Sequence, residues 1–274
     1  MPASKTALIT GSTDGVGRVV AKRLAKDGWS VLAHGRSAER GQSLMKEIET
    51  AGGKATFLKA DLASLAEVRT LADTVKKETA ALQLLINNAG IGSAGDKPGR
   101  QESADGHELR FAVNYLAGFL LTLELLPLLR RSAPARIVYV ASIGQQPLDF
   151  DDLMIERDYT GVRAYCQSKL AQIMSGLEFA ARLPAAEVTV NSLHPATFMP
   201  TKPVMAEAGY SIDTLEEGVD TTHRLVTAAD LATTTGRFFD HAREAAANPQ
   251  AYDAAARAEL WRRSLLLVDH ADID

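Results

Sequence analysis

Short apolar runs alternate along the chain with longer stretches in which apolar residues recur every three or four positions. The short runs are rich in Val, Ile and Leu and end at glycine or polar residues, a pattern typical of buried strands. They predict strands at residues 6–10, 31–33, 55–58, 82–86, 136–141, 188–193 and 236–239. The longer stretches have the periodicity of helices with one buried face. They predict a helix that begins near residue 16 and ends at Gly28, and helices at 39–51, 65–78, 103–131, 162–182, 215–226 and 249–268.

Strands that alternate with helices of this length form right-handed βαβ units, in which the strands run parallel. We therefore expect an α/β fold with a mainly parallel sheet of about seven strands and helices on both faces. No linker, repeat or shift in composition divides the chain. The sequence thus predicts a single domain over residues 1–274.

The composition is that of a folded protein, because 46% of the 274 residues are hydrophobic and 23% are charged. A formal net charge of -4 gives no indication of binding to nucleic acid. The single cysteine, Cys166, excludes an internal disulfide bond and a cage of thiolate metal ligands. A reducing compartment, the cytoplasm, is the predicted location.

We expect no targeting segment and no membrane partner. The N-terminal residues lead directly into a strand, without the basic and apolar regions of a signal peptide. The most apolar stretch, Phe119–Leu129, is shorter than a membrane span and contains Glu124 and Pro127.

A glycine-rich segment joins the first strand to the first helix, which is where a nucleotide's phosphates are bound in many parallel sheets. Such a turn needs one glycine for the sharp bend, one for close approach of the backbone and one for packing of helix on strand. The helix then offers its N-terminal amides to a pyrophosphate. The candidate binding residues are Gly11, Ser12, Thr13, Asp14, Gly15, Val16 and Gly17.

The second strand ends at Ala33-His34-Gly35-Arg36, with no acidic residue to accept hydrogen bonds from a ribose 2′-hydroxyl. The guanidinium of Arg36 suits a 2′-phosphate instead, so we favour NADP over NAD. The alternative is that Arg36 is only a solvated cation ahead of the next helix. Asp61 follows the third strand and either reaches the adenine or caps a helix.

Tyr165 and Lys169 are four residues apart, on one face of a predicted helix. A tyrosine with its ordinary pKa of about 10 is a poor acid–base group, but a neighbouring cation favours the phenolate. Ser142 and the segment Asn87-Asn88-Ala89-Gly90 end two strands at the edge where open parallel sheets bind ligands. Asn114 lies in an apolar helical stretch and is either a structural anchor or part of a proton path.

Together these residues resemble the short-chain dehydrogenase/reductase family. The matching pieces are the loop 10–17, the segment 87–90, Asn114, Ser142 and Tyr165-x-x-x-Lys169, in the family's order and spacing. Segments at 150–153, 164–171, 217–239 and 260–261 resemble the branch that includes retinol dehydrogenases and protochlorophyllide reductases. The resemblance implies a Rossmann-type, doubly wound fold.

The resemblance also implies roles for single residues. Tyr165 would be the proton donor in reduction, and Lys169 would lower its pKa and hold the nicotinamide ribose. Ser142 would bind the substrate oxygen, and Asn114 would keep a water that relays protons through Lys169. The remaining expected cofactor contacts are Asn88, Ala89 and Gly90 in the channel, Asp61 and Leu62 at the adenine, and Pro195 and Thr197 at the nicotinamide.

Two departures from the family pattern stand out. The family usually has Pro-Gly after the sixth strand, whereas this chain has Pro195-Ala196, so the local turn is expected to differ. We also see no N-terminal anchor of the kind that membrane-bound retinol dehydrogenases carry, so the resemblance alone does not imply a retinoid substrate.

We expect no metal site, because Asp149, Asp151 and Asp152 form a loop cluster without further ligands at suitable spacing. Cys166 and His194 are interpreted as structural. The loops 144–160 and 196–212 are candidate walls of a substrate pocket, and they offer the apolar residues Leu148, Phe150, Met199, Met205 and Tyr210. Alternatively, these side chains pack inward as part of the core.

The predicted function is NADPH-dependent reduction of a hydrophobic ketone or aldehyde, or oxidation of the corresponding alcohol. The chain would be a carbonyl reductase with a small-molecule substrate, and it is a possible homo-oligomer. Two alternatives stay open: an epimerase or lyase with retained NAD(P), and a non-catalytic NADP-sensing protein.

Overall fold

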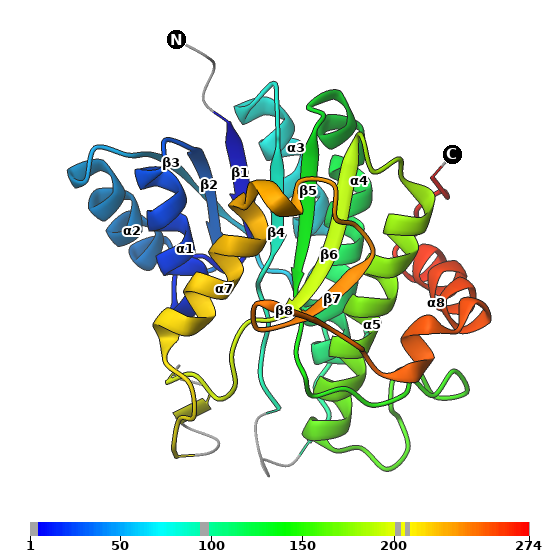
Figure 1. The fold of residues 1–274 in the computed structure, drawn as a ribbon. Coiled ribbons are helices and arrows are strands. Elements are labelled where there is room, and N and C mark those ends of the chain that lie inside the picture. Colours follow the sequence, from blue (N-terminus) through cyan, green and yellow to red (C-terminus); the bar gives the residue numbers. More distant parts are fainter. Residues whose placement is uncertain (1–4, 94–98, 201–203, 206–208, 274) are drawn as a thin grey trace.

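A computed structural model describes residues 5–93, 99–200, 204–205 and 209–273. Eight strands form one sheet in the order β3-β2-β1-β4-β5-β6-β7-β8, in which β8 alone is antiparallel to its neighbour. The predicted doubly wound, mainly parallel sheet is confirmed (Figure 1). The strands are β1 Thr6–Ile9, β2 Ser30–Gly35, β3 Lys54–Lys59, β4 Leu84–Asn87, β5 Ala135–Val140, β6 Val188–His194, β7 Arg237–Asp240 and β8 Arg243–Ala245.

Helices cover both faces of the sheet (Figure 1). Side chains alternate along each strand, so Leu8 faces one layer of helices while Ala7 and Ile9 face the other. Helices α1, α2 and α7 cover one face, and α3, α4, α5 and α8 cover the other. The helices are α1 Gly15–Lys26, α2 Ala38–Thr50, α3 Leu65–Glu78, α4 Ala117–Arg131, α5 Gly161–Arg182, α7 Leu215–Thr227 and α8 Ala254–Leu267.

The predicted helix over 103–131 is wrong at its beginning. Residues 103–108 form turns, in which the Ser103 hydroxyl accepts hydrogen bonds from the backbone N–H groups of Asp105 and His107. Helical structure begins at Leu109 and passes through the π-helix η1, Phe111–Leu116, into α4. The Glu108 carboxylate accepts a hydrogen bond from the Phe111 N–H, 2.7 Å away, and so satisfies a donor at the start of the helix.

Strand β8 was not predicted. It consists of Arg243, Glu244 and Ala245 and contains no apolar run. It pairs with β7 through the hairpin at His241, so its pairing rather than its own pattern makes it a strand.

One helical stretch, Phe111–Arg131, is long and apolar enough to cross a membrane by composition. In the structure 83% of its most apolar window is buried. Aromatic packing explains part of this burial, because the ring of Phe119 lies 5.1 Å from that of Trp261 on α8 and 5.6 Å from that of Phe179 on α5. The stretch is therefore a core helix of this fold.

Candidate functional site

The order of the strands reverses at β1, which has β2 on one side and β4 on the other. A crevice outside the carboxyl ends of the strands forms at such a point in open α/β sheets. The glycine-rich loop 10–17 follows β1 and the segment 88–90 follows β4, so both predicted cofactor segments lie at this reversal.

The glycine-rich loop is packed against the segment after β4. Gly11 has a φ of +65, and a Cβ there would lie 2.8 Å from the Cα of Ala89. A Cβ on Gly17 would meet the carboxamide of Asn88 and lie 2.6 Å from the carbonyl oxygen of Gly11. The Asn88 side chain donates to the Thr10 carbonyl oxygen at 2.8 Å. Each side of the crevice therefore fixes the backbone of the other.

His34, at the end of β2, holds the same loop from the opposite side. Its Nδ1 accepts a hydrogen bond from the Gly11 N–H at 3.2 Å, and its Nε2 lies 3.1 Å from the Ala60 carbonyl oxygen. Burial lowers the pKa of His34 to about 4, so the ring is neutral and can accept and donate at once. The sequence analysis did not single out His34, although a polar residue at the end of a buried strand was a usable signal.

The loop fits the pyrophosphate of a dinucleotide. Helix α1 begins at Gly15 with Asp14 as its N-cap, and its first turn opens toward the crevice with backbone N–H groups. A side chain at position 17 would clash with Asn88 and with the Gly11 carbonyl oxygen, so the helix can approach the loop this closely only with glycine there. Of the other predicted residues, Ser12 and Thr13 lie in the loop before α1, and Val16 lies in its first turn.

Arg36 is an exposed cation at the end of β2. Its side chain is 68% exposed and its guanidinium lies 4.0 Å from the Asp61 carboxylate. Asp61 accepts a hydrogen bond from the Ala63 N–H at 3.0 Å, which is the bond of a turn ahead of α3. Leu62 is buried in the core, with 6% of its surface exposed. The geometry leaves Arg36 available to a ligand, whereas Asp61 and Leu62 already have structural contacts.

The predicted catalytic residues Ser142 and Tyr165 both lie next to Gly144. A Cβ built on Gly144 would lie 3.4 Å from the Ser142 hydroxyl oxygen and 3.6 Å from Cε1 of Tyr165. Ser142 follows β5, and its hydroxyl accepts a hydrogen bond from the Gly144 N–H at 3.0 Å. Tyr165 lies in the first turns of α5 and is half-buried. The strand end and the helix thus bring a hydroxyl and a phenol ring to one place.

Lys169 completes this group from the next turn of α5. Its ammonium nitrogen lies 5.8 Å from the centre of the Tyr165 ring. The nitrogen donates hydrogen bonds to the Val140 carbonyl oxygen at 2.9 Å and to the side-chain oxygen of Gln172 at 3.0 Å. Burial lowers the pKa of Lys169 to about 7, so the ammonium and the amine are both accessible near neutral pH. Gln172 was missed by the sequence analysis, although it is one helical turn beyond Lys169.

Asn114 lies in the π-helix η1, where its side chain anchors the loop after β4. It accepts from the Ile91 N–H at 2.7 Å and donates to the Ile91 carbonyl oxygen at 3.1 Å and to the Ser168 hydroxyl at 2.9 Å. These bonds occupy the carboxamide and support the structural interpretation of its side chain. A Cβ on Gly90 would lie 3.3 Å from the Asn114 oxygen and 3.4 Å from the Lys169 nitrogen, so the three residues adjoin.

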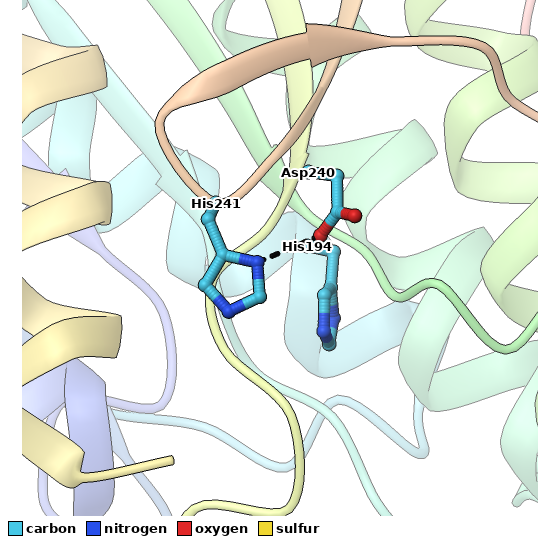
Figure 2. A group of neighbouring side chains, drawn as sticks. All are labelled: His194, Asp240 and His241. Atoms are coloured by element: carbon cyan, nitrogen blue, oxygen red, sulfur yellow. Dashed lines mark hydrogen bonds and ion pairs between the residues drawn. The ribbon is translucent and has the colours of Figure 1, made fainter.

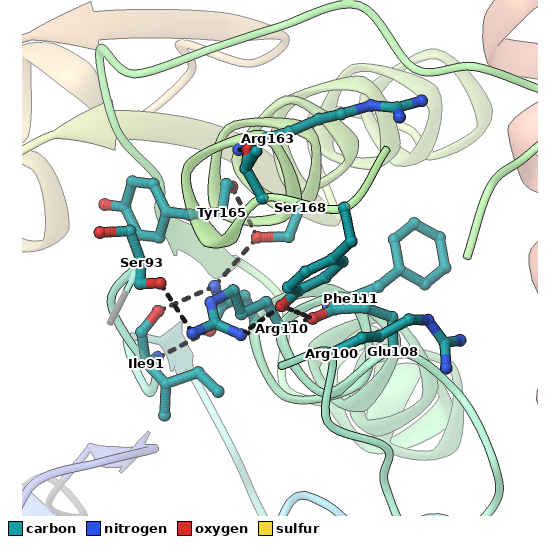
Figure 3. Close-up of polar contacts among 12 residues, drawn as sticks. Ile91, Ser93, Arg100, Glu108, Arg110, Phe111, Arg163, Tyr165 and Ser168 are labelled. Carbon is teal, nitrogen blue, oxygen red and sulfur yellow. Dashed lines mark hydrogen bonds and ion pairs between the residues drawn. The ribbon is translucent and has the colours of Figure 1, made fainter. Parts of the chain in front are cut away.

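A buried ionic network, which was not predicted from the sequence, holds the loop after β4. Figure 3 shows Arg110 directed at the backbone of residues 92–93. Its guanidinium donates to the Gly92 and Ser93 carbonyl oxygens, each at 2.8 Å, and lies 3.5 Å from the Glu108 carboxylate. The Tyr159 hydroxyl lies 2.8 Å from Arg110 and 3.0 Å from Glu108. The network therefore joins the loop after β4 to the segment that precedes α5.

The predicted nicotinamide contacts follow β6. Pro195 is buried and Thr197 is half-buried. The Thr197 hydroxyl lies 3.0 Å from Nε2 of His194, which is itself buried and kept neutral by that burial, with a pKa lowered to about 4. The left-handed conformation in this turn is at Phe198, with a φ of +42, and not at Ala196. Ala196 therefore does not adopt the positive φ that only glycine tolerates easily.

A group of potential metal ligands lies nearby, although none was predicted. One ligand atom from each of His194, Asp240 and His241 lies within 4.8 Å of the others (Figure 2). However, the two ring nitrogens of His241 lie 2.8 Å from the Asp240 carboxylate and 2.9 Å from that of Asp213. A nitrogen at that distance from a carboxylate carries a proton, so the geometry indicates hydrogen bonds rather than a metal centre.

The apolar residues of the two candidate substrate loops divide between core and surface. Leu148 is buried in the core on one face of the sheet, where Phe150 packs against the same cluster, and Met199 packs against the core on the other face. Met205 and Tyr210 are exposed. Phe198 and Ile212, from the same loop, and Ile143, next to Ser142, are exposed as well. Residues 201–203 and 206–208 of the loop 196–212 lie outside the described part of the chain.

Comparison with known proteins identifies the family of this chain. The family described as short chain dehydrogenase matches residues 5–208. The chain belongs to the short-chain dehydrogenase/reductase family. Human retinol dehydrogenase 13 is 34% identical to it over 283 residues, which cover 96% of this chain and 84% of that protein. Human retinol dehydrogenase 14 is also 34% identical, over 96% of this chain and 86% of that protein. The resemblance to the retinol dehydrogenase branch is confirmed.

Solved structures of other members have the same fold. The RhlG/NADP complex of Pseudomonas aeruginosa is 27% identical, with a TM-score of 0.71 over 87% of this chain and 95% of that one. An NADPH-bound carbonyl reductase from chicken fatty liver has a TM-score of 0.69 at 22% identity, over 89% of this chain and 94% of that one. This family member is therefore an oxidoreductase with a nicotinamide cofactor and a small-molecule substrate.

Proposed function

We propose that this protein is an NADPH-dependent carbonyl reductase that reduces a hydrophobic ketone or aldehyde, and that oxidises the corresponding alcohol in the reverse direction. The observation that carries the proposal is the convergence of Ser142 and Tyr165 on Gly144, with Lys169 5.8 Å from the centre of the Tyr165 ring. These groups supply a hydrogen-bond donor, a proton donor and a cation at the edge where the sheet binds ligands.

The proposed role of Tyr165 is to give its phenolic proton to the substrate oxygen. The cofactor supplies the hydride to the carbonyl carbon when it is bound. A cationic Lys169 favours the tyrosinate that this proton transfer leaves behind. The Ser142 hydroxyl donates a hydrogen bond to the same oxygen and stabilises the negative charge that develops there. Asn114 fixes the loop beside Lys169. Its further proposed role is to keep a water that relays protons through Lys169.

The preference for NADP over NAD rests on the end of β2. Arg36 is exposed there, and no carboxylate replaces it at the position that would bind a ribose 2′-hydroxyl. A guanidinium binds a 2′-phosphate through charge-assisted hydrogen bonds. The RhlG complex contains NADP by its description, which supports the same choice. Asp61 and Leu62 would border the adenine, and Pro195 and Thr197 the nicotinamide.

A hydrophobic substrate is supported by the apolar side chains around the mouth of the site. Ile143 is 54% exposed immediately after Ser142, and Phe198, Met205, Tyr210 and Ile212 are exposed on the loop 196–212. Retinol, named in the descriptions of the relatives, is an apolar alcohol of the proposed class. We propose that the loops 144–160 and 196–212 form the walls of the substrate pocket in a single domain.

Cytoplasmic location is also part of the proposal, because the one cysteine, Cys166, is a free thiol. The pKa of this thiol is raised by burial, which agrees with a structural role rather than a nucleophilic one.

Turnover of a panel of carbonyl compounds with NADPH, followed at 340 nm, tests the function. We expect activity on apolar ketones or aldehydes and little on small charged ones. The Tyr165→Phe variant should lose turnover and still bind NADPH, because it lacks only the proton donor. Activity restricted to charged substrates, or full turnover by Tyr165→Phe, would contradict the proposal. An isomerised or cleaved product without net oxidation of NADPH would indicate the epimerase or lyase class instead.

A further inference from the structure

Thr197 is held by one residue from the far end of the substrate loop. Its N–H donates to the Asp213 carboxylate at 2.5 Å, and its carbonyl oxygen accepts from the Asp213 N–H at 3.0 Å. Next to this pair, the Phe198 carbonyl oxygen accepts from the Ile212 N–H at 3.1 Å. The two ends of the loop are thus joined at its base, directly after β6 and directly before α7.

His241 holds Asp213 in place from the hairpin between β7 and β8. Its ring lies between two carboxylates, with Nδ1 2.8 Å from Asp240 and Nε2 2.9 Å from Asp213. The backbone N–H of His241 donates to the His194 carbonyl oxygen at 2.9 Å. The backbone at His241 has a φ of +53, which is unfavourable for a residue with a side chain. A residue kept in this conformation and bonded on both sides of its ring fixes the geometry of its neighbours.

The charged and titratable groups around His241 favour its cationic form. The carboxylates of Asp240 and Asp213 face the ring. In the described part of the chain His194 is the other ring in contact, with its centre 5.4 Å away in an edge-on arrangement, and Figure 2 shows it beside His241 and Asp240. His194 is neutral, as described above, and so opposes a charge on His241 little. Arg243 lies opposite Asp240 in the β7–β8 register.

We propose that Asp213 and His241 are positioning residues that fix Thr197 for the nicotinamide end of the cofactor, and that this positioning depends on the charge of His241. The inference rests on the proposed function, in which Thr197 contacts the nicotinamide carboxamide. After its bond to His194, the Thr197 hydroxyl retains hydrogen-bonding capacity for that group. Asp213 fixes the backbone that carries this hydroxyl, and His241 fixes Asp213.

The sign of the pH dependence follows from the two partners. The hydrogen bond to Asp213, followed by that to Asp240, raises the pKa of His241. The stabilisation is therefore complete below the ordinary histidine pKa of about 6.5 and is lost as the pH rises through the raised value. The Thr197 N–H and His241 lower the pKa of Asp213, so loss of its charge begins only in more acidic solution. The positioning is expected at pH 6 and should weaken in alkaline solution.

Binding of two ligands by the full chain tests the inference. NADP+ carries the nicotinamide, whereas adenosine 2′,5′-bisphosphate carries only the adenosine and its phosphates. The test variants are His241→Asn, which tolerates a positive φ but does not titrate, and Asp213→Asn, which keeps the size of the side chain. The matched control is His223→Asn, because His223 forms a histidine–aspartate pair with Asp27 at 2.6 Å on another surface.

We expect each test variant to raise the Kd of NADP+ about tenfold at pH 6 and to leave the Kd of the bisphosphate unchanged. The ratio of variant to wild-type Kd for NADP+ should fall toward one as the pH rises through the raised pKa of His241, because the wild type then also loses the charged contact. The titration of Lys169 is common to both proteins and cancels in this ratio. The double variant should bind NADP+ no more weakly than either single variant, because the two residues act as one unit.

Four results would overturn the inference. An equal loss of both ligands would indicate general damage to the fold, and an effect of His223→Asn as large as that of His241→Asn would do the same. A ratio that does not change with pH would exclude a role for the charge of His241. Loss of NADP+ binding by the wild type after treatment with a chelator would show that these residues hold a metal. If the wild type binds neither ligand, the proposed function itself fails.

Discussion

The ammonium nitrogen of Lys169 lies 3.0 Å from the side-chain oxygen of Gln172, one turn further along α5. Both side chains are buried, and Gln172 is only 1% exposed. Burial lowers the pKa of Lys169 to about 7. An oxygen acceptor at hydrogen-bond distance opposes that burial, because it stabilises the charged form. Gln172 therefore helps to set the pH range in which Lys169 is a cation beside Tyr165.

Two substitutions of Gln172 should move the pH dependence of catalysis in opposite directions. In Gln172→Leu the ammonium loses an acceptor, so its pKa falls and activity should be lost at a pH about one unit lower than in the wild type. In Gln172→Glu a carboxylate faces the ammonium, so the loss should move to higher pH. The measurement is kcat/KM from pH 5 to 10 with an apolar ketone. If both variants shift in the same direction, or neither shifts, Gln172 does not control the charge of Lys169.

Arg36→Ala should reduce the preference for NADPH over NADH. The KM for NADPH is expected to rise about 10- to 100-fold, the equivalent of one charge-assisted contact to a phosphate, while the KM for NADH changes little. Lys54→Ala is the control, because Lys54 is an exposed cation at the opposite end of the same sheet. Equal increases in both KM values would mean that Arg36 does not contact the 2′-phosphate.

The order of strands and helices could be predicted because a doubly wound sheet buries both of its faces. The central strands then carry continuous apolar runs, as in Leu84–Ile86 and Ile137–Val140, and each covering helix has one apolar stripe. The prediction failed where tertiary contacts determine the local structure. Strand β8 forms only through pairing with β7, and residues 103–108 form turns because the Ser103 hydroxyl binds backbone N–H groups.

The residues at the ends of strands were predictable for a similar reason. Parallel strands bring their carboxyl ends to one edge, so Gly11, Asn88 and Ser142 meet there whatever the intervening sequence. The contacts of Arg110 and His241 could not be predicted in this way. Each depends on segments that lie far apart in the chain. Arg110 binds both residues 92–93 and Tyr159, and His241 binds Asp213. Hydrophobic periodicity contains no information about such polar contacts.

The Arg110 network should be strongly coupled. Arg110→Met leaves the fully buried carboxylate of Glu108 without its cation, and we expect the free energy of unfolding to fall by about 3–5 kcal/mol. The double variant Arg110→Met/Glu108→Gln should recover part of this loss, because the amide is neutral, its oxygen can accept from the Phe111 N–H and its NH2 group can donate to the Tyr159 hydroxyl. Urea unfolding of the three proteins gives the comparison. Additive losses would show that the two side chains do not interact.

Gly144 tests whether the substrate oxygen lies between Ser142 and Tyr165. Gly144→Ala adds a methyl group 3.4 Å from the Ser142 hydroxyl and 3.6 Å from the Tyr165 ring, which are ordinary packing distances. The free energy of unfolding and the Kd for NADPH should therefore stay close to their wild-type values. The methyl group is expected to narrow the space beside Ser142 and Tyr165, so kcat/KM should fall about tenfold for a bulky ketone and less for a small aldehyde. Steady-state kinetics with both substrates make this comparison. An equal effect on both substrates would mean that the reacting carbonyl lies elsewhere. A methyl group that narrows the site should slow the bulky ketone more than the small aldehyde.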